Sequence, residues 1–153
     1  MFNVVLYEPE IPPNTGNIAR LCGATFSRLH IVGVTGFRMD DRTLRRAGLD
    51  YWQEVSLERH IDLQALYARY PQGRYFYFTT KANEIYSTID YRQGDFLVFG
   101  PEARGLPDSV LAENRDKCYR IPMPNSRVRS LNLATSVGIV LYEALRQNDF
   151  GGR

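Results

Sequence analysis

Three side chains near the start of the chain could bind an anion. Asn14, Asn17 and Arg20 follow one another at intervals of three residues, at the beginning of a segment with helical character. This spacing predicts that they share one face of a helix near its N-terminus, where backbone N–H groups favour anions. Arg20 adds a permanent positive charge whose planar fork matches phosphate. The alternative is that the asparagines only cap the helix and that Arg20 is solvated.

A second segment would let the backbone approach a flat ligand. Residues 99–107 read FGPEARGLP, in which Gly100 directly follows an apolar run and Pro101 stiffens the turn. Gly105 can adopt a positive φ, which other residues rarely do. The amides of such a loop could contact a ligand closely, and an ordinary Gly/Pro turn is the alternative.

A third segment runs from a strand-like stretch into the longest helical stretch. Residues 121–132 read IPMPNSRVRSLN, with Ser130 and Asn132 at the expected start of the helix. Arg127 and Arg129 add positive charge beside them. Capping of the helix by Ser130, with two exposed arginines, is the alternative.

Strands and helices that alternate along the chain must position these segments. Short apolar runs predict strands over residues 3–8, 29–33, 52–56, 75–79, 96–99 and 117–121. Helices are predicted over residues 14–26, 40–49, 60–70, 107–113 and 130–147. This alternation predicts an α/β fold, a parallel sheet with helices on both faces. Ligands of such sheets bind outside the carboxyl ends of the strands, where all three segments are expected.

The composition fits a single globular domain covering residues 1–153. A length of 153 residues is that of one domain, and 44% hydrophobic with 24% charged residues are ordinary values. The net charge is only +2, yet 17 of the 19 basic residues are arginine. Arginine binds phosphate and stacks on bases, so an RNA partner is compatible with this balance. Codon bias toward arginine would give the same balance.

Several function classes lack their sequence signatures. The chain has no GxxxxGK[ST], GxGxxG or GxSxG motif, which argues against a P-loop and a dinucleotide-binding fold. Cys22 and Cys118 stand far apart without a CxxC motif, so we expect two buried free thiols and neither a zinc site nor a disulfide. His30 and His60 have no paired acidic or Cys motif, so no metal is expected, and His30 should be structural within its strand.

The beginning of the chain and its apolar runs indicate a cytoplasmic protein. Residues 1–10 have no basic region followed by a long apolar stretch, so no signal peptide is expected. No run of 18 or more apolar residues occurs, so no transmembrane helix is expected either.

Taken together, the three segments resemble the three motifs of the SPOUT methyltransferases. The family pattern is N-x-G-N-x-x-R near the start, then G-P-E-x-x-G-L, then I-P-M followed by S-L-N-L-x-x-S at the last helix. This chain carries the patterns in that order within residues 14–20, 100–106 and 121–136. The match looks closest to the minimal bacterial branch that methylates the wobble nucleotide of tRNA.

This resemblance implies an enzyme that transfers a methyl group from S-adenosylmethionine, without a metal, to a ribose 2′-hydroxyl. The substrate would be the wobble nucleotide at position 34, a cytidine or modified uridine in the tRNA anticodon loop. The fold implied is an α/β domain with a deep C-terminal trefoil knot, assembled as a homodimer through its first and last helices. Alternatives are a SPOUT methyltransferase of another tRNA or rRNA site, or an RNA-binding dimer without catalysis.

The resemblance also assigns roles to individual residues. Those expected at the cofactor are Phe78, Thr79, Gly100, Gly105, Ile121, Met123, Ser130 and Leu131. Those expected in catalysis are Arg20, Asn17, Glu102 and Asn132. Candidates for RNA contact are Arg45, Arg46, Arg127, Arg129 and Tyr142.

Arg20 is the expected centre of the chemistry. A guanidinium has a pKa above about 12 and is a poor base, so we expect Arg20 to hold the target phosphate and stabilise alkoxide charge. Glu102 is expected to hold Arg20 or Asn17 in place, and Asn17 and Asn132 to fix loop geometry.

Overall fold

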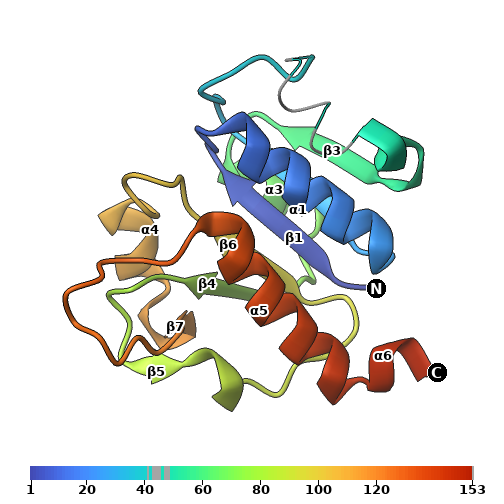
Figure 1. The fold of residues 1–153 in the computed structure, drawn as a ribbon. Coiled ribbons are helices and arrows are strands. Elements are labelled where there is room, and N and C mark those ends of the chain that lie inside the picture. Colours follow the sequence, from blue (N-terminus) through green and yellow to red (C-terminus); the bar gives the residue numbers. More distant parts are fainter. Residues whose placement is uncertain (41, 43–45, 47–48, 153) are drawn as a thin grey trace.

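The computed structural model describes residues 1–40, 42, 46 and 49–152, and these build a seven-stranded sheet with helices on both faces (Figure 1). The strand order is β3-β2-β1-β6-β4-β7-β5, and the paired strands all run parallel. The strands are β1 Asn3–Tyr7, β2 Arg28–Val32, β3 Ser56–His60, β4 Tyr75–Phe78, β5 Glu84–Ile85, β6 Phe96–Phe99 and β7 Cys118–Arg120. The α/β class predicted from alternating elements is confirmed.

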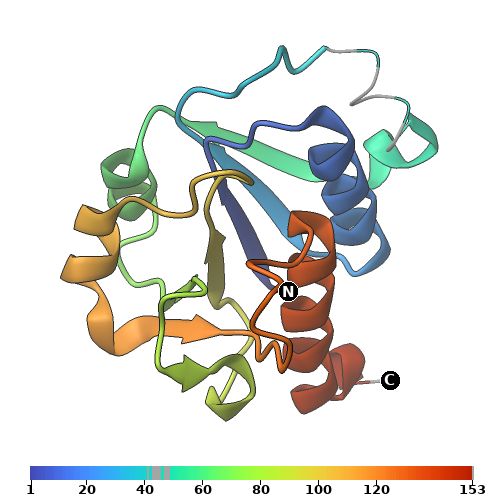
Figure 2. The same ribbon diagram turned by 60° about the vertical axis from the view of Figure 1, so that its left-hand side comes forward.

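Helices connect these strands in the crossover manner that parallel pairing requires. The α-helices are α1 Pro12–Ala24, α3 Leu63–Arg69, α4 Asp108–Glu113, α5 Leu133–Gln147 and the short α6 Asp149–Gly152. The 3-10 helices among the described residues are η1 Leu49–Glu54, η2 Tyr86–Thr88 and η3 Arg115–Lys117. Figures 1 and 2 show α1 and α5 side by side on one face of the sheet, with α3 and α4 on the other.

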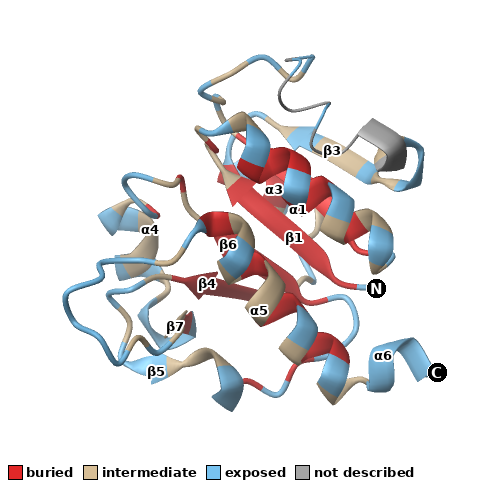
Figure 3. Cartoon of the chain, in the orientation of Figure 1, coloured by how far each residue is buried: buried red, intermediate tan, exposed pale blue. Residues whose placement is uncertain are grey.

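The core consists of two apolar clusters separated by the sheet. Val4 and Leu6 of β1 pack with α1 and α5 on one face, whereas Val5 faces the cluster containing Leu66 of α3. The central strands are therefore buried on both sides, as Figure 3 shows for β1, β4 and β6. This burial explains why their sequences read as continuous apolar runs rather than alternating ones.

The two helices nearest the predicted motifs begin at different residues from those expected. Helix α1 begins at Pro12 rather than residue 14, because Pro12 and Pro13 occupy the first helical turn, where the missing N–H costs nothing. Helix α5 begins at Leu133 rather than residue 130, because Asn132 is its N-cap and accepts a hydrogen bond from the Thr135 N–H. Capping by Ser130, the alternative considered above, is therefore wrong.

The edge of the sheet was the least accurately predicted region. Residues 52–54 belong to the 3-10 helix η1, and the third strand is Ser56–His60. The polar sequence of this edge strand, SLERH, carries little apolar periodicity, so the shift was not visible. Helix α3 begins at Leu63 because Asp62 caps it, and the two-residue strand β5 was not predicted. Most of the predicted helix over residues 40–49 lies outside the described residues.

Candidate functional site

A cavity of about 450 Å³ lies at the carboxyl ends of β4, β6 and β7. Its lining comes from the loops after these strands and from the start of α5. The eight residues expected at the cofactor all contribute to it: Phe78, Thr79, Gly100, Gly105, Ile121, Met123, Ser130 and Leu131. The volume lies within the range typical of small-molecule sites, about 300–1,000 Å³.

The loop after β6 folds back so tightly that only glycine fits at Gly100. A Cβ atom there would lie 2.2 Å from the Leu106 amide nitrogen and 2.4 Å from the Gly105 carbonyl carbon. Gly105 has a φ of +70°, and its N–H donates to the Pro101 carbonyl over 2.9 Å. Gly100 and Gly105 therefore permit the tight backbone conformation of the loop that forms this wall of the cavity.

The Glu102 carboxylate ties this loop to the beginning of α1. It accepts hydrogen bonds from the N–H groups of Glu10 and Ile11, over 2.8 and 2.9 Å, and from Asn14 Nδ2 over 3.1 Å. The expectation that Glu102 holds Asn17 or Arg20 is wrong, since its side-chain partner on α1 is Asn14. Glu102 is thus a junction between two of the three predicted segments.

Helical geometry explains why Asn14 and not Asn17 meets Glu102. Three residues fall about 60° short of a full helical turn, so a spacing of three twice over rotates Arg20 about 120° away from Asn14. Asn14 is buried, whereas Asn17 and Arg20 are exposed and are not part of the cavity lining. The predicted common face is therefore wrong for Asn14, whereas Asn17 and Arg20 both lie on the exposed side of α1.

Asn132 extends the junction to the third segment. Its Nδ2 donates to Asn14 Oδ1 over 3.0 Å, and its Oδ1 accepts from the Thr135 N–H over 3.1 Å. Donor and acceptor are fixed at each hydrogen bond of this series. The carboxylate of Glu102 can only accept, so it orients the Asn14 amide, and the Asn14 amide in turn orients that of Asn132. We call Glu102, Asn14 and Asn132 the loop junction. It joins the segments that border the cavity.

Two cations at the cavity were not singled out from the sequence. Lys81 pairs with Asp108 over 3.0 Å, and Arg104 pairs with Glu10 over 3.3 Å and with Glu8 over 3.5 Å. Lys81 and Arg104 both line the cavity. Lys81 is one of only two lysines in an arginine-rich chain, which was the one available signal.

The candidate RNA contacts lie at the surface. Arg46, Arg127 and Arg129 are exposed, and Arg129 also borders the cavity. Tyr142 of α5 is 46% exposed, with its ring centroid 6.5 Å from that of Phe150. Arg45 lies outside the described residues.

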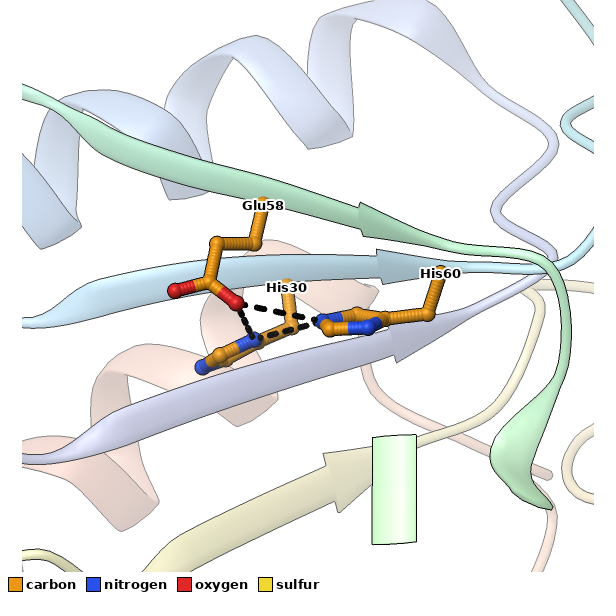
Figure 4. Close-up of side chains that lie close together, drawn as sticks. All are labelled: His30, Glu58 and His60. Atoms are coloured by element: carbon orange, nitrogen blue, oxygen red, sulfur yellow. Dashed lines mark hydrogen bonds and ion pairs between the residues drawn. The ribbon is translucent and has the colours of Figure 1, made fainter. Parts of the chain in front are cut away.

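No local sequence motif pairs the two histidines with an acid, yet the fold brings Glu58 close to both of them. His30 Nδ1 lies 3.1 Å from His60 Nε2, and Glu58 Oε1 lies 3.8 and 3.6 Å from these two atoms (Figure 4). Parallel register places Glu58 opposite His30 and His60 opposite Val32, a proximity that no local motif encodes. His30 is fully buried in its strand, which confirms a structural position, and burial lowers its pKa to about 4.

The cysteines match expectation. Cys22 and Cys118 are free and buried, and burial raises the pKa of Cys22 to about 12, so its thiol is protonated at neutral pH. In the described part of the chain, no helix has the length and apolarity to cross a membrane.

Comparison with known proteins points to one family. The model of the SpoU rRNA Methylase family matches residues 1–142. A curated relative from Escherichia coli strain K12, tRNA (cytidine(34)-2'-O)-methyltransferase, is 54% identical over 155 residues, which cover 99% of this chain and 97% of that protein.

Solved structures agree in fold over the whole chain. One, described as "Structural insights into the 2-OH methylation of C/U34 on tRNA", has a TM-score of 0.93 and 45% identity, covering 100% of this chain and 98% of that one. An AdoMet-bound rRNA methyltransferase from Sinorhizobium meliloti has a TM-score of 0.82 and 28% identity, covering 95% of this chain and 56% of that one.

Proposed function

The chain belongs to the SpoU rRNA methylase family, and we propose that it methylates the ribose 2′-hydroxyl of nucleotide 34 in tRNA, using S-adenosylmethionine. The observation that carries this proposal is the 54% identity, over nearly the full length of both chains, with a tRNA (cytidine(34)-2'-O)-methyltransferase. The nucleotide would be cytidine or a modified uridine, in line with the C/U34 of the structurally similar protein.

The residues at the cavity fit the methyl donor. Gly100 and Gly105 allow the tight loop that would lie against a flat adenine, and Ile121 and Met123 offer apolar contact. The backbone amides and carbonyls of this loop would read the polar edge of the base, which needs no particular side chain. Phe78, Thr79, Ser130 and Leu131 complete the proposed cofactor contacts. The sulfonium of the bound donor supplies an already activated methyl group, so no metal is needed for transfer.

The loop junction would keep these segments in register during transfer. Correct alignment of reacting groups can lower a barrier by about 7–11 kcal/mol in the best cases, so small loop displacements matter. Glu102 and Asn132 would act by positioning, since their hydrogen bonds join the start of α1, the loop after β6 and the start of α5. Asn17, exposed on α1 beside Arg20, is proposed to fix the geometry of this segment in the catalytic site.

Arg20 is proposed to bind the phosphate next to the target ribose and to stabilise charge on its 2′-oxygen. Because Arg20 does not line the cavity of its own chain, this role requires the tRNA or a partner chain to span from α1 to the cavity. Arg20→Lys keeps the charge but loses the two-point fork. We expect methyl transfer to fall about tenfold or more, equivalent to about 1.4 kcal/mol. Arg115→Lys, at an exposed site on η3, is the control, and an unchanged rate for Arg20→Lys would contradict this role.

The assembly we propose is a homodimer through α1 and α5, with a C-terminal trefoil knot in each chain. Support comes from the position of these helices on one face of the sheet and from apolar side chains exposed beside them, Phe26, Tyr142 and Phe150. Support for the knot is the fold shared with structures of this family. Sedimentation equilibrium would test the dimer, and a monomer at micromolar concentration would contradict it.

Binding of the anticodon loop is proposed to use Arg45, Arg46, Arg127, Arg129 and Tyr142. Arginine contacts to phosphate release counterions, so affinity should fall steeply as salt increases. A tRNA-modifying role also fits a cytoplasmic location, which fractionation of cells would test.

The test of function is transfer of labelled methyl from S-adenosylmethionine to tRNA isolated from cells lacking this protein. Nuclease digestion then maps the label. Label on the 2′-oxygen of nucleotide 34 supports the proposal, and label at another tRNA position would replace the site but keep the reaction. The same assay on rRNA from these cells tests the rRNA alternative. Binding of tRNA without any transfer would favour an RNA-binding dimer without catalysis.

A further inference from the structure

A second polar cluster lies on the sheet between β2 and β3, apart from the cavity. His30, Glu58 and His60 point toward one another there (Figure 4), and none of them lines the cavity. They are two imidazoles and a carboxylate, the ligand set that zinc sites with an open fourth position use. We call these three residues the strand-edge cluster.

Its dimensions match those of a metal centre. Ligand atoms about 2.0–2.1 Å from a tetrahedral zinc ion lie about 3.3 Å from one another. The three ligand atoms here are separated by 3.1, 3.6 and 3.8 Å. An ion could therefore sit between them with shifts of a few tenths of an ångström, within the reach of side-chain rotation.

The hydrogen-bond pattern fixes the tautomer that a metal needs. Asn3 Nδ2 donates to the Gly94 carbonyl over 3.0 Å, so Asn3 Oδ1 faces His30 Nε2 at 2.9 Å. An amide oxygen only accepts, so Nε2 of His30 carries the proton. In the neutral ring, Nδ1 is then a bare lone pair directed at His60 and Glu58. Metal-binding histidines are commonly oriented in this way by an acceptor on their other nitrogen.

A hydrogen bond and an ion pair also fix the orientation of the Glu58 carboxylate. The Tyr70 hydroxyl donates to Glu58 Oε2 over 2.6 Å, and Arg28 Nε lies 3.6 Å from the same oxygen. This leaves Oε1 directed at the two rings. The carboxylate supplies the negative charge that a divalent cation needs, and Tyr70 holds it as an outer partner.

The cluster is enclosed but reachable. The His30 and His60 side chains are 0% and 8% exposed, while that of Glu58 is 28% exposed. His60 also lines a surface hollow formed with residues 33–35, 59 and 61, at the carboxyl ends of β2 and β3. An ion could enter by this route and would find ligands already desolvated.

We propose that the strand-edge cluster binds one divalent first-row transition-metal ion per chain, Zn²⁺ by preference, through His30 Nδ1, His60 Nε2 and Glu58 Oε1. The mixed nitrogen and oxygen set favours such ions over Mg²⁺ or Ca²⁺, which prefer all-oxygen sites. The ion would cross-link the edge strand β3 to β2. Its role would be structural, because the methyl-transfer cavity is built from other residues.

The competing account is a hydrogen-bonded pair without metal, in which His60 Nε2–H donates to His30 Nδ1. That account leaves Glu58 Oε1 beyond hydrogen-bond range of both rings, at 3.6 and 3.8 Å. It also predicts that the chain takes up no stoichiometric metal ion at this cluster. The two accounts therefore differ in a direct binding measurement.

The experiment uses the full chain, stripped of metal with a chelator, dialysed and titrated with ZnCl₂ by calorimetry without tRNA or S-adenosylmethionine. The visible spectrum with Co²⁺ gives a second readout. We expect one equivalent bound per chain, at least about 100-fold weaker binding in Glu58→Gln and His60→Asn, and about tenfold weaker binding in Tyr70→Phe.

Matched controls keep the result interpretable if a variant is less stable. Glu84→Gln changes an exposed glutamate on β5, at the opposite edge of the sheet, and Tyr67→Phe removes a hydroxyl that bonds only Tyr77 in the described structure. Both should bind Zn²⁺ as the unaltered chain does. The proposal is overturned if the unaltered chain takes up no Zn²⁺, or if Glu58→Gln, His60→Asn and the controls bind alike. Since the chain has only two histidines, binding through imidazole cannot arise elsewhere.

Discussion

In both the loop junction and the strand-edge cluster, polar side chains orient one another through a series of hydrogen bonds. The two differ in the last group of that series. In the loop junction, the carboxylate of Glu102 orients Asn14, which orients Asn132. This series of hydrogen bonds ends on the N–H of Thr135. In the strand-edge cluster, the Gly94 carbonyl orients Asn3, which orients His30. The series ends on His30 Nδ1, an acceptor that lies 3.1 Å from His60 Nε2 and 3.8 Å from Glu58 Oε1.

This difference separates a scaffold from a binding site. A series of hydrogen bonds that ends on a backbone N–H satisfies its members and gains little from a ligand, whereas two ring nitrogens beside a carboxylate can share either a proton or a metal ion. The loop junction therefore holds the walls of the cavity and leaves the chemistry to the ligand inside it. The strand-edge cluster presents its own side chains as ligands.

The largest expected effect on methyl transfer comes from a change in the loop after β6, which forms a wall of the cavity. Gly100→Ala would place a Cβ 2.2 Å from a backbone nitrogen, so the loop after β6 must open. We expect methyl transfer to fall about 100-fold or more, equivalent to about 2.7 kcal/mol, with Zn²⁺ binding unchanged. Steady-state transfer and calorimetry measure the two sites separately, and a variant with full transfer activity would contradict the tight-loop account.

Removal of the metal should lower the stability of the fold through the strand-edge cluster. If Zn²⁺ is present at 100 times its dissociation constant, it should stabilise the fold by about 2.7 kcal/mol. Denaturant unfolding with and without Zn²⁺ measures this difference. Glu58→Gln should abolish the dependence on Zn²⁺, and a dependence that survives this change would place the ion elsewhere.

Glu102→Gln tests how much the hydrogen bonds of the loop junction contribute to the free energy of unfolding. An amide cannot accept at both of its terminal atoms, so at least one of the three donors facing Glu102 loses its partner. The expected loss of unfolding free energy is about 1–3 kcal/mol. Glu84→Gln is the matched control, expected within about 0.5 kcal/mol of the unaltered chain. Equal stability of the two variants would show that the junction contributes nothing.

Two substitutions of Asn132 separate its role as N-cap of α5 from its hydrogen bond to Asn14. Asn132→Asp retains an oxygen that caps α5 but loses the donor to Asn14, whereas Asn132→Ala loses both. We expect the alanine variant to be less stable than the aspartate variant by about 1 kcal/mol, the usual value of an N-cap. Both should transfer methyl groups more slowly, and full activity of Asn132→Asp would remove the cross-link from the account.

The sequence predicted the cavity better than the contacts that brace it. Gly100, Gly105 and Met123 lie in loops directly after strands, and the edge at which parallel strands end can be inferred from element order alone. That Asn14 rather than Asn17 meets Glu102 depends on which face of α1 packs toward the loop after β6, and that packing is a tertiary contact between residues 88 positions apart.

The strand-edge cluster was not predictable in the same way. His30 and Glu58 are brought together by the pairing of β2 with β3, and the position of β3 was itself misplaced by the sequence pattern. A polar edge strand has too little apolar periodicity to reveal its register. Long-range pairing of this kind becomes visible only in three dimensions.

The central claim is that the cavity and its loop junction serve methyl transfer to tRNA while the strand-edge cluster does not. The most direct test is the labelled-methyl assay with nucleotide mapping, run in parallel on the unaltered chain, Gly100→Ala and Glu58→Gln. We predict label on the ribose 2′-oxygen of nucleotide 34 for the unaltered chain and for Glu58→Gln, and almost none for Gly100→Ala. Absence of label with the unaltered chain, or equal labelling by Gly100→Ala, would contradict the account.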